Sequence, residues 1–281
     1  MTNRNGAGMR RRAAIVALLL AGCATAIERA DSIAARANLG ERVVDGAGFR
    51  HRVYETGSVA GGPLWIYIEG DGIPWVTEYL PARDPTPRTA VAMAMLVEGP
   101  RPAAYIGRPC YFGFAGDPGC EPVLWTHGRF APVVVRSMQA AIESLLAAHG
   151  TPGRPVVLVG FSGGGTLATL LAARLRNACA VITVASPLDL DEWAQEREYS
   201  RLSASLDPAR EPPLPAHIGQ LHLRGRGDDV VAAANGSTYL HAHPDARLEI
   251  VDGPRHGIEW AAEWARLVRE PTALPLAGCR P

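Results

Sequence analysis

Short hydrophobic runs alternate along the chain with longer segments in which hydrophobic residues recur at helical spacing. The short runs predict strands at 63–69, 103–106, 156–159, 180–184, 217–223 and 247–251. The run at 156–159 has no polar alternation, which is typical of a strand buried on both faces. The longer segments predict helices at 89–97, 130–149, 165–176, 230–241 and 257–269. Strands that alternate with helices indicate an α/β fold built on a doubly wound, mostly parallel sheet.

Two segments depart from this alternation. Residues 49–55 (FRHRVYE) alternate polar and apolar positions, which predicts an edge strand paired with a segment near 42–44. Residues 189–215, which we call the excursion, follow the sixth strand and mix polar, proline and aromatic residues. The excursion is too long for a simple connection, so we expect a cap over the active edge of the sheet, with Trp193 shaping a pocket.

The first 22 residues have the pattern of a secretory signal. Arg10, Arg11 and Arg12 precede the apolar run AAIVALLLAG, which is too short to span a bilayer as a mature helix. The run ends in LAGC, at Cys23, and resembles the bacterial lipobox. The alternative is an ordinary secretory signal with a chance cysteine.

The lipobox resemblance implies cleavage before Cys23 and transfer of a diacylglycerol to its sulfur, which would anchor the protein in the envelope. Ala24 follows the cysteine, which by the same resemblance favours the outer membrane, facing the periplasm. The predicted organisation is a signal peptide over 1–22, a tether or first helix over 23–40, and one domain over 41–281.

Composition excludes several classes of chemistry. All 28 basic residues are arginine, so a Walker A lysine, a Schiff-base lysine and a lysine general base are absent from the chain. The net charge is zero, but four arginines lie in the predicted signal, and their removal leaves 24 basic against 28 acidic residues. This mildly acidic chain has no basic stripe, so we predict no nucleic-acid partner.

The four remaining cysteines fit an oxidising compartment. Cys110 and Cys120 bracket the short loop YFGFAGDPG and are predicted to form a disulfide. We expect this loop to form the wall of the pocket opposite the excursion. Cys179 and Cys279 would both lie at the sheet edge opposite the active site, where either a disulfide or free thiols are consistent with the sequence. No C-x-x-C pair or mixed His–Cys cluster suggests zinc.

The stretch from Pro155 to Ala172 carries the chemistry. A buried strand leads into Gly160 to Gly164 (GFSGG), which fits G-x-S-x-G, and then into an Ala- and Leu-rich helix. Small residues two before and two after Ser162 let the chain double back, which lifts the hydroxyl above the sheet beside free helix N–H groups. This turn resembles the nucleophile elbow of the α/β-hydrolase superfamily.

The same residues also admit a second interpretation. Gly163, Gly165 and Ala168 satisfy the dinucleotide fingerprint G-x-G-x-x-A, for which Asp189 or Asp191 would supply the ribose-binding acid. That interpretation requires an early βαβ unit, whereas this strand comes late in the chain.

The α/β-hydrolase resemblance extends to two later turns. The strand ending near residue 223 is followed by RGRGDDVV, which resembles the family's G-x-x-D-x-x-V turn and implies that Asp228 is the acid. Asp229 is an alternative, as are Asp189 and Asp191 one strand earlier. The final strand leads into DGPRHG, which implies that His256 is the base.

An oxyanion hole completes the implied site. The N–H of Gly163 is one expected donor, and the loop EGDG supplies the other from Asp71 or Gly72. Glu69 departs from the family, which often has histidine there, but a backbone donor does not depend on that side chain.

These features occur in the family's order over residues 63–257, and the dinucleotide interpretation explains none of the later ones. We therefore predict an envelope-anchored serine hydrolase that acts on a small-molecule or lipid ester through an acyl-enzyme, with no metal or organic cofactor. An acyltransferase with the same triad and a non-catalytic envelope lipoprotein are the alternatives. Substrate identity and oligomeric state are not predicted.

Overall fold

The computed structural model describes residues 25–57 and 61–279. The predicted signal and the lipidation residue Cys23 therefore lie outside the described residues. Within the described part of the chain, no helix is both long and apolar enough to cross a bilayer.

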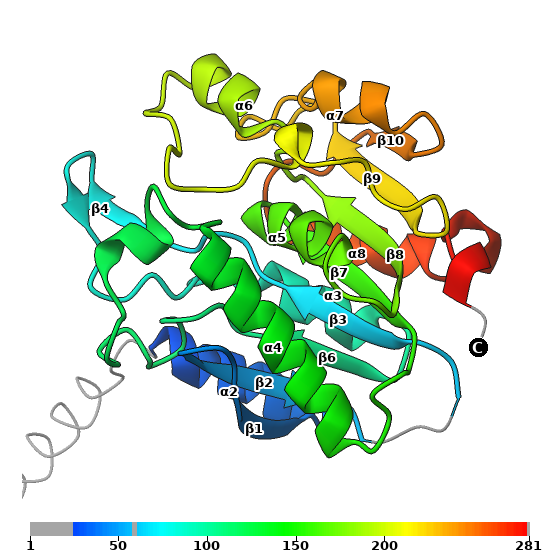
Figure 1. Cartoon of the computed structure of the whole chain (residues 1–281), viewed down its shortest axis with the longest axis horizontal. Helices are drawn as coiled ribbons and strands as arrows, with labels where there is room; N and C mark the ends of the chain where they lie inside the picture. The colour runs from blue at the N-terminus through cyan, green and yellow to red at the C-terminus, as the bar shows by residue number, and fades with distance from the viewer. Residues whose placement is uncertain (1–24, 58–60, 280–281) are drawn as a thin grey trace, which may run out of the picture.

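One eight-stranded sheet forms the centre of the molecule (Figure 1), with strand order β1-β2-β6-β3-β7-β8-β9-β10. Its strands are β1 (Gly40–Asp45), β2 (Arg50–Glu55), β3 (Leu64–Ile68), β6 (Ala103–Ile106), β7 (Val156–Phe161), β8 (Ala178–Val184), β9 (Gly219–Gly225) and β10 (Arg247–Val251). β2 pairs antiparallel with β1 and with β6, and the remaining pairs are parallel. The predicted α/β class, with a doubly wound and mostly parallel sheet, is confirmed.

Helices cover both faces of this sheet. They are α2 (Ala26–Arg36), α3 (Val91–Glu98), α4 (Pro132–Ala148), α5 (Gly163–Ala172), α6 (Leu190–Glu196), α7 (Ser237–Ala242) and α8 (Glu259–Leu267). On one face α4 packs against α5, and on the other α3 packs against α2 and α8. Every residue of β3, β7 and β8 is consequently buried, which is why these strands are apolar without alternation.

One local prediction was wrong, and one pair of strands was not predicted. The helix expected over 230–241 is reduced to α7, because the Asp228 carboxylate accepts hydrogen bonds from the N–H groups of Val230 and Val231 and holds them in a turn. Gly236, with φ of +84°, directs the chain into α7. A small hairpin of β4 (Trp75–Thr77) and β5 (Leu80–Pro81) was not predicted, and it projects from one side of the molecule in Figure 1.

Both cysteine pairs form disulfides. Cys110 and Cys120 close a short loop, and Cys179 joins the start of β8 to Cys279 near the carboxyl terminus. The second bond crosses 100 residues of sequence and ties the last segment of the chain to the central sheet.

Candidate active site

Ser162 lies between β7 and α5 in a strained backbone conformation, with φ of 52° and ψ of −130°. The neighbouring glycines permit this turn. A Cβ at Gly160 would lie 2.2 Å from the Gly164 carbonyl oxygen, and a Cβ at Gly164 would lie 2.2 Å from the Ile68 carbonyl oxygen. The glycines of the motif are therefore required by packing, and they leave the serine hydroxyl above the carboxyl ends of the strands.

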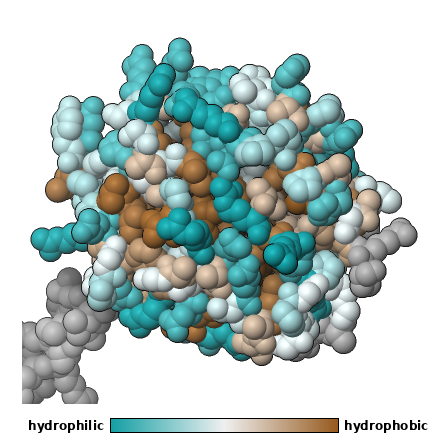
Figure 2. Space-filling model, in the orientation of Figure 1, coloured by the Kyte–Doolittle hydropathy of each residue, from teal (hydrophilic) through white to brown (hydrophobic). Residues whose placement is uncertain are grey.

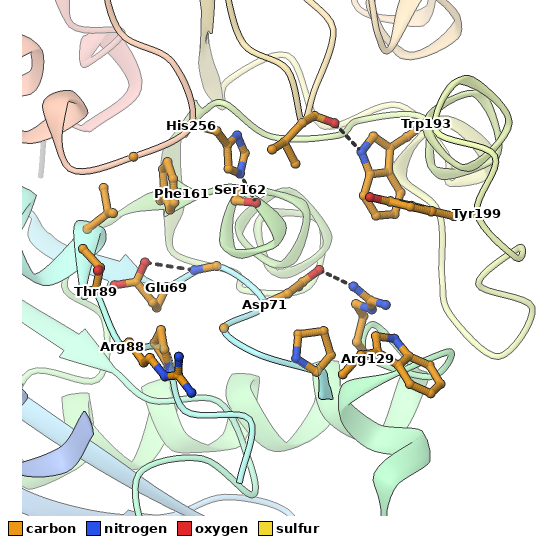
Figure 3. Close-up of a pocket in the computed structure, with 18 of the residues that line it drawn as sticks. Glu69, Asp71, Arg88, Thr89, Arg129, Phe161, Ser162, Trp193, Tyr199 and His256 are labelled. Carbon is orange, nitrogen blue, oxygen red and sulfur yellow. Dashed lines mark hydrogen bonds and ion pairs between the residues drawn. The ribbon is translucent and has the colours of Figure 1, made fainter. Parts of the chain in front are cut away.

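His256 connects this hydroxyl to a carboxylate. Its Nε2 lies 2.9 Å from Ser162 Oγ (Figure 3). Its Nδ1 lies 2.9 Å from Asp228 Oδ2. In the tautomer that this arrangement favours, Nδ1–H donates to the carboxylate and Nε2 accepts from the serine hydroxyl. The ring also packs against Phe161, with centroids 5.1 Å apart. The structure thus brings together the three residues expected from the resemblance.

The Asp228 carboxylate is fixed by three hydrogen bonds. Its Oδ2 accepts from His256, and its Oδ1 accepts from the N–H groups of Val230 and Val231 at 2.8 and 2.9 Å. Burial raises the pKa of Asp228, but the hydrogen bond from His256, its charge and the two backbone donors outweigh burial, so the pKa lies below its ordinary value. Asp228 therefore stays ionised at neutral pH.

The other candidate acids have different partners. Asp229 forms an exposed ion pair with Arg255, at 2.8 Å. Asp189 accepts from the N–H of Glu192 and caps α6, while Asp191 pairs with Arg210. Of the four candidates, only Asp228 is hydrogen-bonded to His256.

The loop from Gly70 to Gly72 runs beside the serine, since a Cβ at Gly70 would lie 3.1 Å from Ser162 Cβ. The N–H groups of Asp71 and Gly163 make no hydrogen bond within the described residues, and Gly163 opens α5, whose first N–H groups have no intrahelical acceptor. Gly72 has φ of +68° and packs against the Pro85 carbonyl oxygen, so it forms the tight turn of this loop.

Glu69 holds this loop from beneath. Its Oε1 accepts from the N–H of Gly70 at 3.1 Å, and its Oε2 accepts from the N–H of Ala92 in the first turn of α3 at 3.0 Å. Burial raises the pKa of Glu69 to about 8. In the sequence, Glu69 is only a departure from the family pattern. In the structure, its carboxyl group connects the loop to α3.

Asp71 is shared by two buried guanidinium groups. Arg108 Nη1 contacts Asp71 Oδ1, and Arg129 Nη1 contacts Oδ2, each at 2.6 Å. Burial raises the pKa of Asp71, but the two arginines outweigh it and the pKa lies below its ordinary value. The Tyr111 hydroxyl also donates to the Asp71 carbonyl oxygen at 2.9 Å. No sequence signal pointed to this cluster, because its members lie far apart in the chain.

A cavity of about 1170 Å³ opens above Ser162. Its wall is formed by Trp75 and Tyr79 of the hairpin, by Trp193 and Tyr199 of the excursion, and by His127 and Arg129. The excursion therefore lines the pocket as expected. The Cys110–Cys120 loop was expected to form the opposite wall, and this prediction was wrong, because no residue of that loop lines the cavity. Tyr111 of the loop instead donates a hydrogen bond to the Asp71 carbonyl oxygen.

The dinucleotide interpretation does not fit this geometry. The Asp71 carboxylate occupies the space next to Gly163, where a Cβ would lie 2.0 Å from Oδ1, so a carboxylate stands where the phosphates would approach the start of α5. Gly165 packs against Ser186. Over residues 25–57 and 61–279, no group of three or more His, Cys, Asp or Glu side chains could hold a metal ion.

Comparison with known proteins supports the fold but gives no family by sequence. No family model and no curated protein sequence matches the chain. Solved structures do match, including a puromycin-hydrolysing peptidase of Mycobacterium tuberculosis, with 18% identity over 85% of this chain and 39% of that protein and a TM-score of 0.56.

Two further structures are similar to the same extent. The Pyrococcus furiosus esterase Pf2001 is 14% identical over 84% of this chain and 94% of its own, with a TM-score of 0.56. The Pyrococcus horikoshii acylaminoacyl peptidase is 11% identical over 84% of this chain and 42% of its own, also at 0.56. The chain spans about two fifths of the length of the two peptidases. Together, these comparisons establish the α/β-hydrolase fold.

Proposed function

We propose that this protein is a serine hydrolase that cleaves an ester or a related acyl bond through an acyl-enzyme. The observation that carries the proposal is the continuous hydrogen-bonded path from Ser162 through His256 to Asp228, at the mouth of a large cavity. A serine hydroxyl becomes a useful nucleophile at neutral pH only when a base accepts its proton and an acid orients that base. The path meets both requirements.

In the proposed reaction, Nε2 of His256 accepts the Ser162 proton as Oγ attacks the acyl carbon. The negative charge that develops on the carbonyl oxygen is received by the N–H groups of Gly163 and Asp71. The imidazolium, stabilised by Asp228, then donates its proton to the leaving alcohol. Water, deprotonated by the same histidine, attacks the acyl-enzyme and releases the acid and free Ser162.

We also propose that a lipid on Cys23 anchors the enzyme to the outer membrane, on the side facing the periplasm. The support is the lipobox pattern LAGC after a charged and then apolar segment. Replacement of Cys23 with Ser should release the protein from the membrane fraction, and continued membrane association would contradict the anchor.

The adjacent aspartates offer a matched test of the catalytic proposal. Asp228→Asn should lower kcat for p-nitrophenyl butyrate by about 10³- to 10⁴-fold, because the imidazole loses the acceptor that fixes its tautomer. Asp229→Asn removes only the exposed contact with Arg255 and should leave kcat unchanged. Equal effects of the two substitutions would contradict the assignment of Asp228.

A further inference from the structure

Among the described residues, five of the nine exposed large hydrophobic side chains lie at the cavity mouth or in the hairpin beside it. The large hydrophobic residues with the most exposed surface among the described residues are Val43, Val76, Tyr79, Leu80, Val123, Tyr199, Leu248, Ile250 and Ile258. Tyr79, Tyr199 and Ile258 line the cavity of Ser162, and Val76 and Leu80 lie beside Tyr79 in the same hairpin. An apolar patch around an active site usually marks a binding surface, whereas scattered exposed residues do not.

The hairpin presents its apolar side chains to solvent. Val76 is 62% exposed, Tyr79 at its tip is 84% exposed and Leu80 is 56% exposed. Figure 2 shows hydrophobic surface at the left of the molecule, on the side from which the β4 hairpin projects in Figure 1. We define this hairpin together with Tyr199 and Ile258 as the apolar rim.

The start of α2 contacts a residue that lines the cavity. Arg29, in the first turns of α2, donates a hydrogen bond to the carbonyl oxygen of Arg88, which lines the cavity. Thr25 caps α2. The hairpin and the start of α2 lie on the same side of the molecule in Figure 1, so the anchor that we propose before α2 favours docking of that side on a bilayer.

We infer that the apolar rim docks on a lipid bilayer of zwitterionic headgroups and that the enzyme takes its ester substrate directly from that bilayer. Tyrosine at the tip of an exposed element is typical of membrane interfaces, because its ring is apolar and its hydroxyl is polar. The exposed charged residues that line the cavity are Glu78, Glu198, Glu259 and Arg88, three acids against one base. That balance disfavours an anionic surface. The substrate part of the inference rests on the proposed hydrolase function.

A double substitution on the hairpin tests the inference. Val76 and Leu80 do not line the cavity, and Val76→Thr/Leu80→Thr puts β-branched threonine, which suits a strand, at both positions while removing apolar surface. The full chain is assayed on soluble p-nitrophenyl butyrate and on a long-chain ester embedded in phosphatidylcholine vesicles. Activity on the embedded ester should fall tenfold or more, with activity on the soluble ester unchanged.

The edge strand β10 supplies the matched control, because Leu248 and Ile250 are exposed on the same molecule away from the rim. Leu248→Thr/Ile250→Thr should change neither activity. Equal loss on both esters, or on neither, in the hairpin variant would overturn docking. Loss of embedded-ester activity together with conversion of a dimer to a monomer would assign the rim to a second copy of this chain and would equally overturn it.

A measurement independent of catalysis separates docking from the proposed function. Tyr79→Trp places an indole at the tip of the hairpin, and its added fluorescence should be quenched when brominated phosphatidylcholine replaces ordinary phosphatidylcholine in the vesicles. Absence of quenching would overturn docking. If quenching occurs but the wild type cleaves neither ester, the hydrolase proposal fails while the docking surface stands.

Discussion

At the scale of single residues, the site depends on buried charged groups as much as on the serine. Asp228 is held ionised by its hydrogen bonds, and Asp71 by two arginines. Glu69 differs from both, since burial raises its pKa to about 8 while its two oxygens accept the N–H of Gly70, in the loop next to Ser162, and the N–H of Ala92, in α3. The ionisation of Glu69 should therefore affect the stability of the fold.

The pH dependence of unfolding tests the environment of Glu69. Because its pKa is higher in the folded chain than the ordinary 4.5, the folded chain holds a proton that the unfolded chain releases between pH 4.5 and about 8. This stabilisation is complete below pH 4.5 and is lost as the pH rises through about 8. The free energy of unfolding in urea should decline across this window, by a few kcal/mol. Glu69→Gln should reduce the decline.

Glu78→Gln is the control for that measurement, because Glu78 also lines the cavity but is exposed. Its unfolding should keep the pH dependence of the wild type. A decline that is as steep in Glu69→Gln as in the wild type would mean that another group is responsible.

At the scale of elements, the excursion gives the pocket its distal wall. Trp193 in α6 donates from Nε1 to the Val230 carbonyl oxygen at 2.9 Å and packs edge-on against Tyr199. Val230 follows directly on the turn that holds Asp228. The indole of Trp193 thus connects α6 to the turn that holds Asp228, and it also faces the cavity.

Trp193 should consequently determine which acyl chains fit. Trp193→Ala opens the distal wall and should shift the preference among p-nitrophenyl esters toward longer acyl chains, measured as kcat/KM from acetate to decanoate. Trp193→Phe retains most of the ring and should shift it less. A chain-length profile that is identical in all three proteins would show that α6 does not shape the acyl pocket.

At the scale of the whole molecule, the features that could be predicted from the sequence are those encoded in short local patterns. Unbroken apolar runs marked β3, β7 and β8 because both faces of those strands are covered, and short turns after strands marked Ser162 and His256. The Asp71 cluster could not be predicted, since Arg108 and Arg129 lie 37 and 58 residues from Asp71 and meet it only after folding. The prediction of a helix over 230–241 was wrong because the side chain of Asp228 accepts hydrogen bonds from the N–H groups of Val230 and Val231, where that helix would begin.

The two disulfides should differ in how much they contribute to stability and to activity. The Cys179–Cys279 bond spans 100 residues and the Cys110–Cys120 bond spans 10, so chain entropy predicts a loss of about 5 kcal/mol of stability for Cys179→Ser/Cys279→Ser and about 3 for Cys110→Ser/Cys120→Ser. The short loop carries Tyr111, which supports Asp71. Its double variant should therefore lose more kcat per folded molecule, although it loses less stability. The opposite order in kcat would contradict the role given to this loop.

The central claim is that Ser162 is the nucleophile of an enzyme, and covalent labelling tests it most directly. A fluorophosphonate reacts with a serine only where a base and an oxyanion hole activate it. Incubation of the full chain with the probe, followed by digestion and mass spectrometry, should give one adduct, on Ser162, and Ser162→Ala should give none. An adduct on another residue, labelling of both proteins, or labelling of neither would contradict the account.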